Sequence, residues 1–312
     1  MVKKVLVIAD THLYTGADFN QKKKEANLPL GERGFLRFSP LLYKDQDALS
    51  SYYFQKMVSV ISHSEDEFSY LVDLGDSTFG SYNQGLITLA SQEERIEYNR
   101  LLKERFKEKV DKRVFVHGNH DLGFQNKISK FFNFGEYQKG ISKKSFEKAK
   151  ELIGPPWQFF KVGRFNFLVL NSEVIRAVEV LESIRFSERE FFISEKKKQN
   201  HYIVRKLKDS KGPVVLLVHD PLQLKYVWDI LSYFKERICL TLGGHFHNVY
   251  YGKIIRLFFP VFQEINLRLV PSPWPWGGVI FRKIVNRGGG FVTLELSDFR
   301  KSFNLKYHWL EL

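Results

Sequence analysis

Residues 113–121 read Arg-Val-Phe-Val-His-Gly-Asn-His-Asp, an apolar run that ends in a glycine turn rich in polar side chains. Such a run is typical of a short buried strand, and glycine permits the sharp turn that follows it. Apolar runs elsewhere in the chain are followed by Asp10-Thr11-His12, Gly75-Asp76, His219 and Gly244-His245-Phe246-His247. Five expected strand ends therefore carry Asp, Asn or His.

The chain around these ends alternates between apolar runs and charged amphipathic stretches. The expected strands are Lys4–Ala9, Ser69–Leu74, Arg113–His117, Phe165–Leu170, Val214–Val218 and Cys239–Leu242. The expected helices include Ala48–His63, Gln92–Val110 and Ser187–Leu207. This alternation predicts an α/β fold with a mostly parallel sheet that is covered by helices.

The pattern changes after Asn248 to short β-rich segments broken by Pro and Gly. These segments are Val249–Leu257, Gly278–Val285, Gly290–Leu296 and Phe303–Trp309. We expect them to form antiparallel strands that complete a second sheet. The polar segment Leu13–Asp47 has no clear period and is interpreted as a long loop or an insertion near the site. Residues 271–278, rich in Pro and Trp, favour a rigid packed turn, with an aromatic lip or a lipid-contacting tip as alternatives.

The composition is that of a folded globular protein, because 44% of the 312 residues are hydrophobic and 15% are aromatic. This length fits one domain over residues 1–312, with core motifs in 5–248 and a β-rich completion in 249–312. Cys239 is the only cysteine, which excludes an internal disulfide and indicates a reducing compartment. No stretch approaches the roughly 18 apolar residues of a membrane span. We expect a cytoplasmic protein without a transmembrane segment.

The formal net charge of +13 comes from 48 Lys and Arg against 35 Asp and Glu. Such a balance favours anionic partners, which include nucleic acid, an anionic lipid surface touched peripherally, and phosphorylated substrates. It does not choose among them. Short runs such as Lys196-Lys197-Lys198 are more typical of a solvated face.

The polar strand ends favour a metal site. The carboxyl ends of strands in an open α/β sheet lie at one edge, so residues that are distant in sequence can meet there. Five of the nine histidines fall in these clusters, and Asp, His and Asn without Cys suit Mn, Fe, Zn and related divalent ions. The other four histidines, His63, His117, His201 and His308, are assigned to the surface or to core packing.

These blocks resemble the signature of the calcineurin-like metallophosphoesterases, which runs Asp-x-His, Gly-Asp, Gly-Asn-His-Asp or Glu, His and Gly-His-x-His. Every block is present in order between Val5 and Asn248. The resemblance implies a four-layer αββα sandwich of two mixed β-sheets flanked by helices, with a dinuclear metal site at the strand ends. It also implies hydrolysis of a phosphodiester or phosphomonoester by a hydroxide that bridges the metals.

Residue by residue, the resemblance divides seven candidate ligands between two divalent metal ions. They are Asp10, His12 and His247 for one ion, Asn119, His219 and His245 for the other, and Asp76 as the bridge. Manganese is the expected metal, with iron, zinc, cobalt, nickel and magnesium as alternatives. Two such ions about 3.5–4 Å apart can lower the pKa of a shared water and clamp the attacking and leaving oxygens.

Two further residues receive catalytic roles from the resemblance. The histidine that matches His120 acts on the leaving group or on a phosphoryl oxygen without binding metal, and Asp121 would orient it. The alternative for Asp121 is a turn-forming residue, since Asp accepts hydrogen bonds from nearby backbone amides.

A finer resemblance is carried by residues 118–124, by Val169-Leu170-Asn171-Ser172 and by His219-Asp220-Pro221-Leu222. It points to the eukaryotic phosphodiesterases that remove ethanolamine phosphate from GPI anchors, whose membrane spans have no counterpart here. Only a phosphodiester substrate is inferred from it. Two alternatives stay open, a DNA or RNA nuclease of the same superfamily and a non-catalytic binding scaffold, and the scaffold is disfavoured because every expected ligand is present.

Overall fold

Two five-stranded sheets form the centre of the protein. The computed structural model describes residues 2–11, 54–78, 82–83, 86–87, 89–122, 141–180, 186–246, 264–271, 290–298 and 302–310. In spatial order the first sheet contains β12 (Ser302–Trp309), β11 (Gly290–Ser297), β1 (Val2–Ile8), β2 (Phe68–Asp73) and β5 (Val110–Phe115). The second contains β10 (Leu267–Leu269), β9 (Ile238–Gly243), β8 (Val214–Val218), β7 (Phe165–Leu170) and β6 (Gln158–Val162). A separate pair joins β3 (Tyr82–Asn83) to β4 (Leu86–Ile87).

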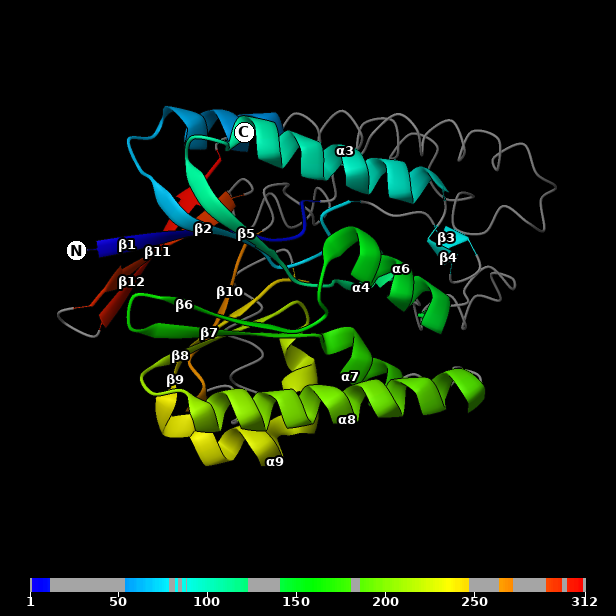
Figure 1. Ribbon diagram of the computed structural model, residues 1–312. Coiled ribbons are helices and arrows are strands. Elements are labelled where there is room, and N and C mark those ends of the chain that lie inside the picture. The colour runs from blue at the N-terminus through cyan, green and yellow to red at the C-terminus, as the bar shows by residue number, and fades with distance from the viewer. Residues whose placement is uncertain are drawn as a thin grey trace, which may run out of the picture.

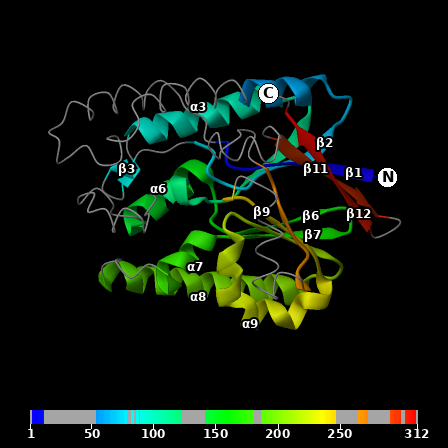
Figure 2. The ribbon, with the colours of Figure 1, turned by 180° about the vertical axis from the view of Figure 1, so that it is seen from behind.

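Helices cover the outer face of each sheet, so the molecule has four layers (Figure 1). Among the described residues, one outer layer contains a helical stretch over residues 54–63 and α3 (Leu89–Arg105). The opposite layer contains α7 (Ser172–Glu179), α8 (Phe186–Asp209), α9 (Trp228–Leu231) and short 3-10 helices at Pro221–Val227 and Ser232–Arg237. Figure 2 shows the same layers from behind. Between the outer layers, beyond β5, lie α4 (Asn119–Leu122) and α6 (Lys143–Ile153).

The central strands are buried on both faces. In β1, Val5 and Val7 contact the core between the two sheets, whereas Leu6 and Ile8 contact the core beneath the first helical layer. Successive side chains of a strand point to opposite faces, so each of these strands needs an apolar residue at nearly every position. This double burial is why the strands appear in the sequence as continuous apolar runs and not as alternating patterns.

The expected strands agree well with the observed ones, and the α/β fold of two mixed sheets flanked by helices is confirmed. Phe165–Leu170 and Val214–Val218 have the bounds that the sequence predicts, and the other four strands differ by a few residues at their ends. Strands β3, β4, β6 and β10 were not predicted from the sequence. Strand β10 has three residues, and β3 and β4 have two each, too few for a recognisable pattern.

Of the expected C-terminal strands, β11 and β12 are antiparallel as predicted, but the prediction that they complete a second sheet is wrong for these two. β11 pairs antiparallel with β1, from Val2 opposite Ser297 to Val7 opposite Val292, and β12 pairs with β11. The physical reason is again double burial. Leu294 faces the core between the sheets and Phe291 faces the core beneath the first helical layer, so β11 continues the first sheet beside β1.

Several expectations lie outside the described residues. They concern His12, His247, Leu13–Asp47, Val249–Leu257, Gly278–Val285 and the part of 271–278 that follows Pro271. These stay predictions. Within the part of the chain that the structure describes, no helix combines the length and apolar character needed to cross a bilayer.

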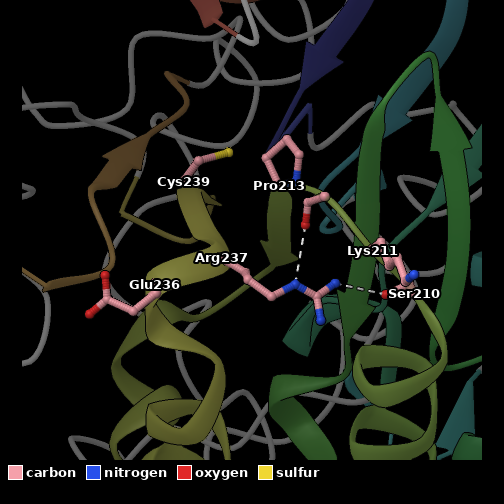
Figure 3. A pocket seen from close by; sticks show the side chains of 7 residues that line it. Ser210, Lys211, Pro213, Glu236, Arg237 and Cys239 are labelled. Atoms are coloured by element: carbon pink, nitrogen blue, oxygen red, sulfur yellow. Dashed lines mark hydrogen bonds between the residues drawn. The ribbon is translucent and has the colours of Figure 1, made fainter.

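A pocket of about 380 Å³ lies at the amino ends of β8 and β9 (Figure 3). Arg237 dominates it and donates hydrogen bonds from Nε to the Gly212 carbonyl at 3.2 Å, from Nη2 to Ser210 Oγ at 3.0 Å, and from Nη1 to the Leu207 carbonyl. Each guanidinium nitrogen is thus used to fasten the end of α8 to the second sheet. The pocket is explained by this structural contact and is separated by the length of the strands from the polar strand ends.

The packing between the sheets can be tested at Leu217, which is fully buried in β8 on the face toward the first sheet. Leu217→Ala removes methyl groups from that core and leaves a cavity, so we expect a loss of about 2–5 kcal/mol in the free energy of unfolding. Urea denaturation measures it. Val60→Ala, at a position 43% exposed, serves as the control and should change stability by less than about 0.5 kcal/mol. Equal effects at both positions would contradict the placement of Leu217.

Candidate metal centre

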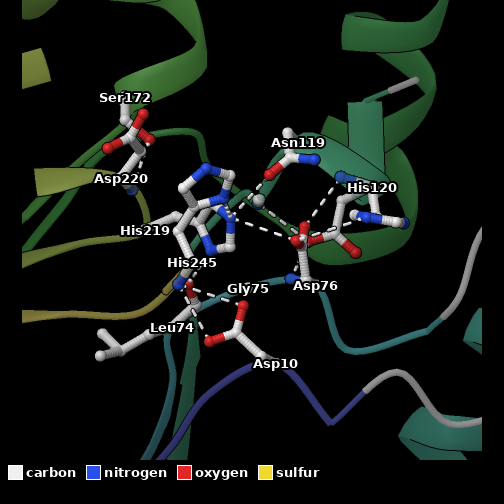
Figure 4. A network of polar contacts seen from close by, with 12 residues as sticks. Asp10, Leu74, Gly75, Asp76, Asn119, His120, Ser172, His219, Asp220 and His245 are labelled. Atoms are coloured by element: carbon white, nitrogen blue, oxygen red, sulfur yellow. Dashed lines mark hydrogen bonds and ion pairs between the residues drawn. The ribbon is translucent and has the colours of Figure 1, made fainter. Parts of the chain in front are cut away.

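The polar ends of five strands meet at one place in the structure (Figure 4). The first sheet contributes the residues that follow β1, β2 and β5, and the second sheet contributes those that follow β8 and β9. They are Asp10, Asp76, Asn119, His120, His219 and His245. Of the expected ligands, His12 and His247 lie outside the described residues, and the other five are brought together.

The tightest part of this group surrounds the imidazole of His219. Its Nε2 lies 2.9 Å from Asn119 Oδ1, 3.2 Å from Asp76 Oδ2 and 3.2 Å from His245 Nδ1. One ligand atom each from Asp76, His219 and His245 all fall within 4.8 Å of one another. This donor set of carboxylate, amide oxygen and imidazole nitrogen fits a divalent cation with oxygen and nitrogen ligands.

Hydrogen bonding fixes the orientation of the His219 ring. Its Nδ1 lies 2.9 Å from the Leu74 carbonyl oxygen, and since a carbonyl only accepts, Nδ1 must carry a proton. In the neutral ring, Nε2 then presents a lone pair to the oxygens of Asp76 and Asn119, which are acceptors too. The Asn119 Nδ2, in contrast, is buried without a hydrogen-bond partner. A proton on His245 Nδ1, 3.2 Å away, can satisfy the lone pair of Nε2, whereas a second proton on His219 or a bound cation would also stabilise the facing oxygens of Asp76 and Asn119.

The electrostatics of the site favour such a positive charge. Burial acts to lower the pKa of His219, but the charge and hydrogen bond of Asp76 and the charge of Asp10 outweigh it, so this pKa lies well above its ordinary value. Burial lowers the pKa of His245 to about 4, which leaves that ring neutral and able to bind metal near pH 7. Burial also raises the pKa of Asp10 well above its ordinary value. A cation in this group would stabilise the ionised carboxylates.

The backbone at the site is strained. Asp10, Asp76 and His245 have φ angles of 51°, 52° and 67°, and Asn266 is the only other non-glycine residue in the described ranges with a positive φ. Such conformations persist only where the surroundings enforce them. Here the His245 amide donates to both Asp10 carboxylate oxygens at 3.1 and 2.9 Å, and the Asp10 amide donates to the Gly75 carbonyl at 3.0 Å. These contacts tie the strand ends of the two sheets together.

His120 and Asp121 lie in the short helix α4 beside this group. The His120 amide donates to Asp76 Oδ1 at 2.8 Å, and its ring Nε2 lies 4.0 Å from Asp76 Oδ2. Asp121 Oδ2 accepts from the amides of Gly118 at 2.9 Å and Asp76 at 3.1 Å. These bonds match the interpretation of Asp121 as a turn residue and extend it, because they fasten two loops to each other. Orientation of the His120 ring by Asp121 stays a prediction.

Sequence reasoning missed a buried carboxylate behind the site. Asp73 accepts hydrogen bonds from the Gly75 amide at 3.0 Å, from Ser77 Oγ at 2.6 Å and from the Tyr98 hydroxyl at 2.7 Å. It therefore holds the turn that presents Asp76. A signal was available, because an aspartate inside an otherwise apolar strand needs buried partners. Tyr98 lies in a charged helix and had no comparable signal.

The assignment of His117 to packing agrees with its contacts. This ring is buried, with Nε2 3.0 Å from the Gly154 carbonyl and Nδ1 3.3 Å from Asn171 Nδ2, and burial lowers its pKa to about 4. Asn171 in turn caps α7, since its Oδ1 accepts from the amides of Glu173 and Val174. This part of the finer motif is accounted for by helix capping.

The fold and the site together define an α/β protein of two sheets with a candidate metal-binding cluster at the strand ends. The family model for calcineurin-like phosphoesterases matches residues 3–249, and the chain belongs to this family. Family membership supports metal-dependent hydrolysis of phosphate esters in general, and with the ligand cluster it indicates divalent metal ions. No curated protein matches the chain. Among solved structures, it is similar to GAP50, the anchor in the inner membrane complex of Plasmodium, with 13% identity over 100% of this chain and 89% of that one and a TM-score of 0.38.

The closest approach of the loops at the site can be tested at Gly118. A Cβ there would lie 2.2 Å from Asp76 Oδ1 and 2.5 Å from the Asp76 amide nitrogen, so Gly118→Ala must displace the carboxylate. We expect Mn²⁺ affinity, measured by titration calorimetry, to fall by about 10–100-fold.

Gly154→Ala is the matched control. Gly154 has a φ of 113°, which is strained for alanine, but the added Cβ would meet nothing within 4 Å. This variant should lose thermal stability and keep its Mn²⁺ affinity. Unchanged metal binding in Gly118→Ala would show that the Asp76 carboxylate is not constrained as described.

Proposed function

We propose that the protein hydrolyses phosphate esters at this centre with two divalent metal ions. The observation that carries the proposal is the convergence of Asp76, His219 and His245, whose ligand atoms lie within 4.8 Å of one another. Family membership supports the reaction class.

The convergence of Asp76, His219 and His245 and the resemblance of the sequence blocks support the following ligand set. Asn119, His219 and His245 would hold one ion, and Asp76 would be shared with the other, for which Asp10 is placed by its bonds to the His245 amide. His12 and His247 complete the second set in the proposal. Manganese is the preferred ion, because the site has no thiolate and combines carboxylate, amide and imidazole groups.

The two ions, when bound, would lower the pKa of a water toward neutrality and neutralise the charge of the phosphoryl oxygens. The protein's own groups supply positioning. His120 has a side chain 15% exposed and 4.0 Å from Asp76 Oδ2, so its ring can meet a substrate at the edge of the centre. We assign it to stabilise a phosphoryl oxygen or to protonate the leaving oxygen. Asp121 would keep His120 in place through the loop that both residues share.

The substrate class is proposed more broadly than the reaction. Phosphodiesters and phosphomonoesters are both proposed, and the finer motif resemblance is compatible with a phosphodiester. The net charge of +13 would suit a nucleic-acid substrate or an anionic lipid surface equally. We propose a cytoplasmic location on the basis of the single cysteine.

Activity of the purified protein tests the proposal directly. With Mn²⁺ present, we expect hydrolysis of bis(p-nitrophenyl) phosphate or of p-nitrophenyl phosphate, measured by release of nitrophenolate. EDTA should abolish the activity and added Mn²⁺ should restore it, since the cations supply the activated water. Single-stranded DNA assayed in parallel would identify a nuclease, whose binding weakens steeply with salt. Absence of hydrolysis with Mn²⁺, Fe²⁺, Zn²⁺, Co²⁺, Ni²⁺ and Mg²⁺ would count against an enzyme.

The role of His120 can be separated from metal binding. His120→Asn should lower kcat by about 10²–10⁴-fold, because it removes a proton donor at the reacting phosphate. The metal content of the variant, measured by mass spectrometry, should stay at that of the wild type. His201→Asn, an exposed position on α8, is the control and should change neither quantity. Loss of metal in His120→Asn would instead identify this residue as a ligand.

A further inference from the structure

Two side chains of α3, a helix of the outer layer, extend to the back of the metal centre. Arg95 and Tyr98 are three residues apart and so lie on the same face of this helix. The Arg95 Nη1 lies 3.4 Å from Asp121 Oδ1, with side chains only 4% and 1% exposed. The Tyr98 hydroxyl donates to Asp73 at 2.7 Å. Each side chain therefore meets a buried carboxylate that holds one of the site loops.

The environment of Arg95 is costly for a cation. Its guanidinium carbon lies 4.8 Å from the ring centroid of Phe115 and 5.4 Å from that of Tyr98. These rings provide partial compensation through cation–π attraction. Even so, the Nε and Nη2 of Arg95 are buried without hydrogen-bond partners. A buried ion pair of this kind is weak evidence for stability, because apolar residues of similar volume would often serve the core as well or better. A role in the site is the more economical reason for it.

Asp121 connects Arg95 to the metal centre. One oxygen of its carboxylate, Oδ1, faces Arg95, and the other, Oδ2, accepts from the amides of Gly118 and Asp76 at 2.9 and 3.1 Å. The Asp76 amide belongs to a residue with a φ of 52°. Contact with the planar guanidinium restricts rotation of the carboxylate and keeps Oδ2 directed at both amides.

We propose that Arg95 is a positioning residue of the centre. Acting through Asp121, it fixes the amides of Asp76 and Gly118, and with them the distance between the Asp76 carboxylate and the His120 ring. The polar contact of Arg95 is with Asp121 and not with the described ligands Asp76, Asn119, His219 and His245. The effect on catalysis rests on the proposed function, whereas the effect on the two amides does not.

Hydrogen exchange at single amides tests the proposal without any assumption about activity. In Arg95→Met we expect the Asp76 and Gly118 amides to exchange at least about tenfold faster, with the amides of β8 unchanged, because only the local restraint is lost. Fragment mass spectrometry resolves these positions. Arg100→Met is the matched control. It removes the same charge from the same helix, but at a side chain 51% exposed that pairs with Glu97 and Glu104, so exchange at both amides should remain as in the wild type.

Kinetics and metal titration provide the second readout. Arg95→Met should lower kcat by about 10–100-fold with a smaller change in KM, since the alignment of the centre changes and substrate contacts do not. Its Mn²⁺ affinity, measured by calorimetry, should fall as well. Arg95→Lys keeps the charge but loses the planar fork, so it should recover part of both losses.

The outcomes separate this proposal from the proposed function. Unchanged exchange at Asp76 and Gly118 in Arg95→Met would overturn the role of Arg95, and a uniform increase that includes β8 would reduce it to general stability and overturn it too. If the wild-type protein hydrolysed no phosphate ester, the proposed function would fail while the exchange result stood by itself. If Arg95→Met failed to fold, Arg95→Lys measured in the same way would decide, with faster exchange expected only at the two amides.

Discussion

The burial of acidic and imidazole groups in one small volume is the constraint on which the rest of the structure depends. Asp10, Asp76 and His219 are at most 1% exposed, and His219 presents Nε2 to a carboxylate oxygen and an amide oxygen at once. Such a group is expensive in a dry interior unless positive charge joins it. The pKa of His219 lies well above its ordinary value although burial acts to lower it. This raised pKa agrees with the need for positive charge in the group. The surrounding contacts hold these atoms close together despite the cost of burying them.

The two sheets keep the residues of the site in place. Three residues of the site have left-handed backbone conformations, each of which costs on the order of 1–3 kcal/mol. Strands buried on both faces provide a rigid base that can carry this cost. Because the site lies between the strand ends of two sheets, closing it also requires hydrogen bonds across the sheets, such as those of the His245 amide to Asp10. The outer layer takes part as well, since α3 contacts the buried carboxylates of Asp73 and Asp121.

The resemblance of the sequence blocks to a known family predicted the reaction class, and the match of residues 3–249 to that family bears this out. The substrate is a different matter. It depends on side chains around the centre and on the distribution of surface charge, and neither follows from the ligand set. A net charge of +13 is compatible with several anionic partners.

From the sequence alone came the local strands, the α/β class, and the identity and order of the polar residues that end the strands. These features are local: apolar runs, glycine turns and residue chemistry appear within a few positions of one another. Only the tertiary structure decided that β11 joins β1, that Asp121 fastens the Gly118 and Asp76 amides, and that Arg95 and Tyr98 reach the site from α3. A strand apolar on both faces signals burial but not its partner, and contacts such as Arg95 with Asp121 depend on how a helix packs across a sheet.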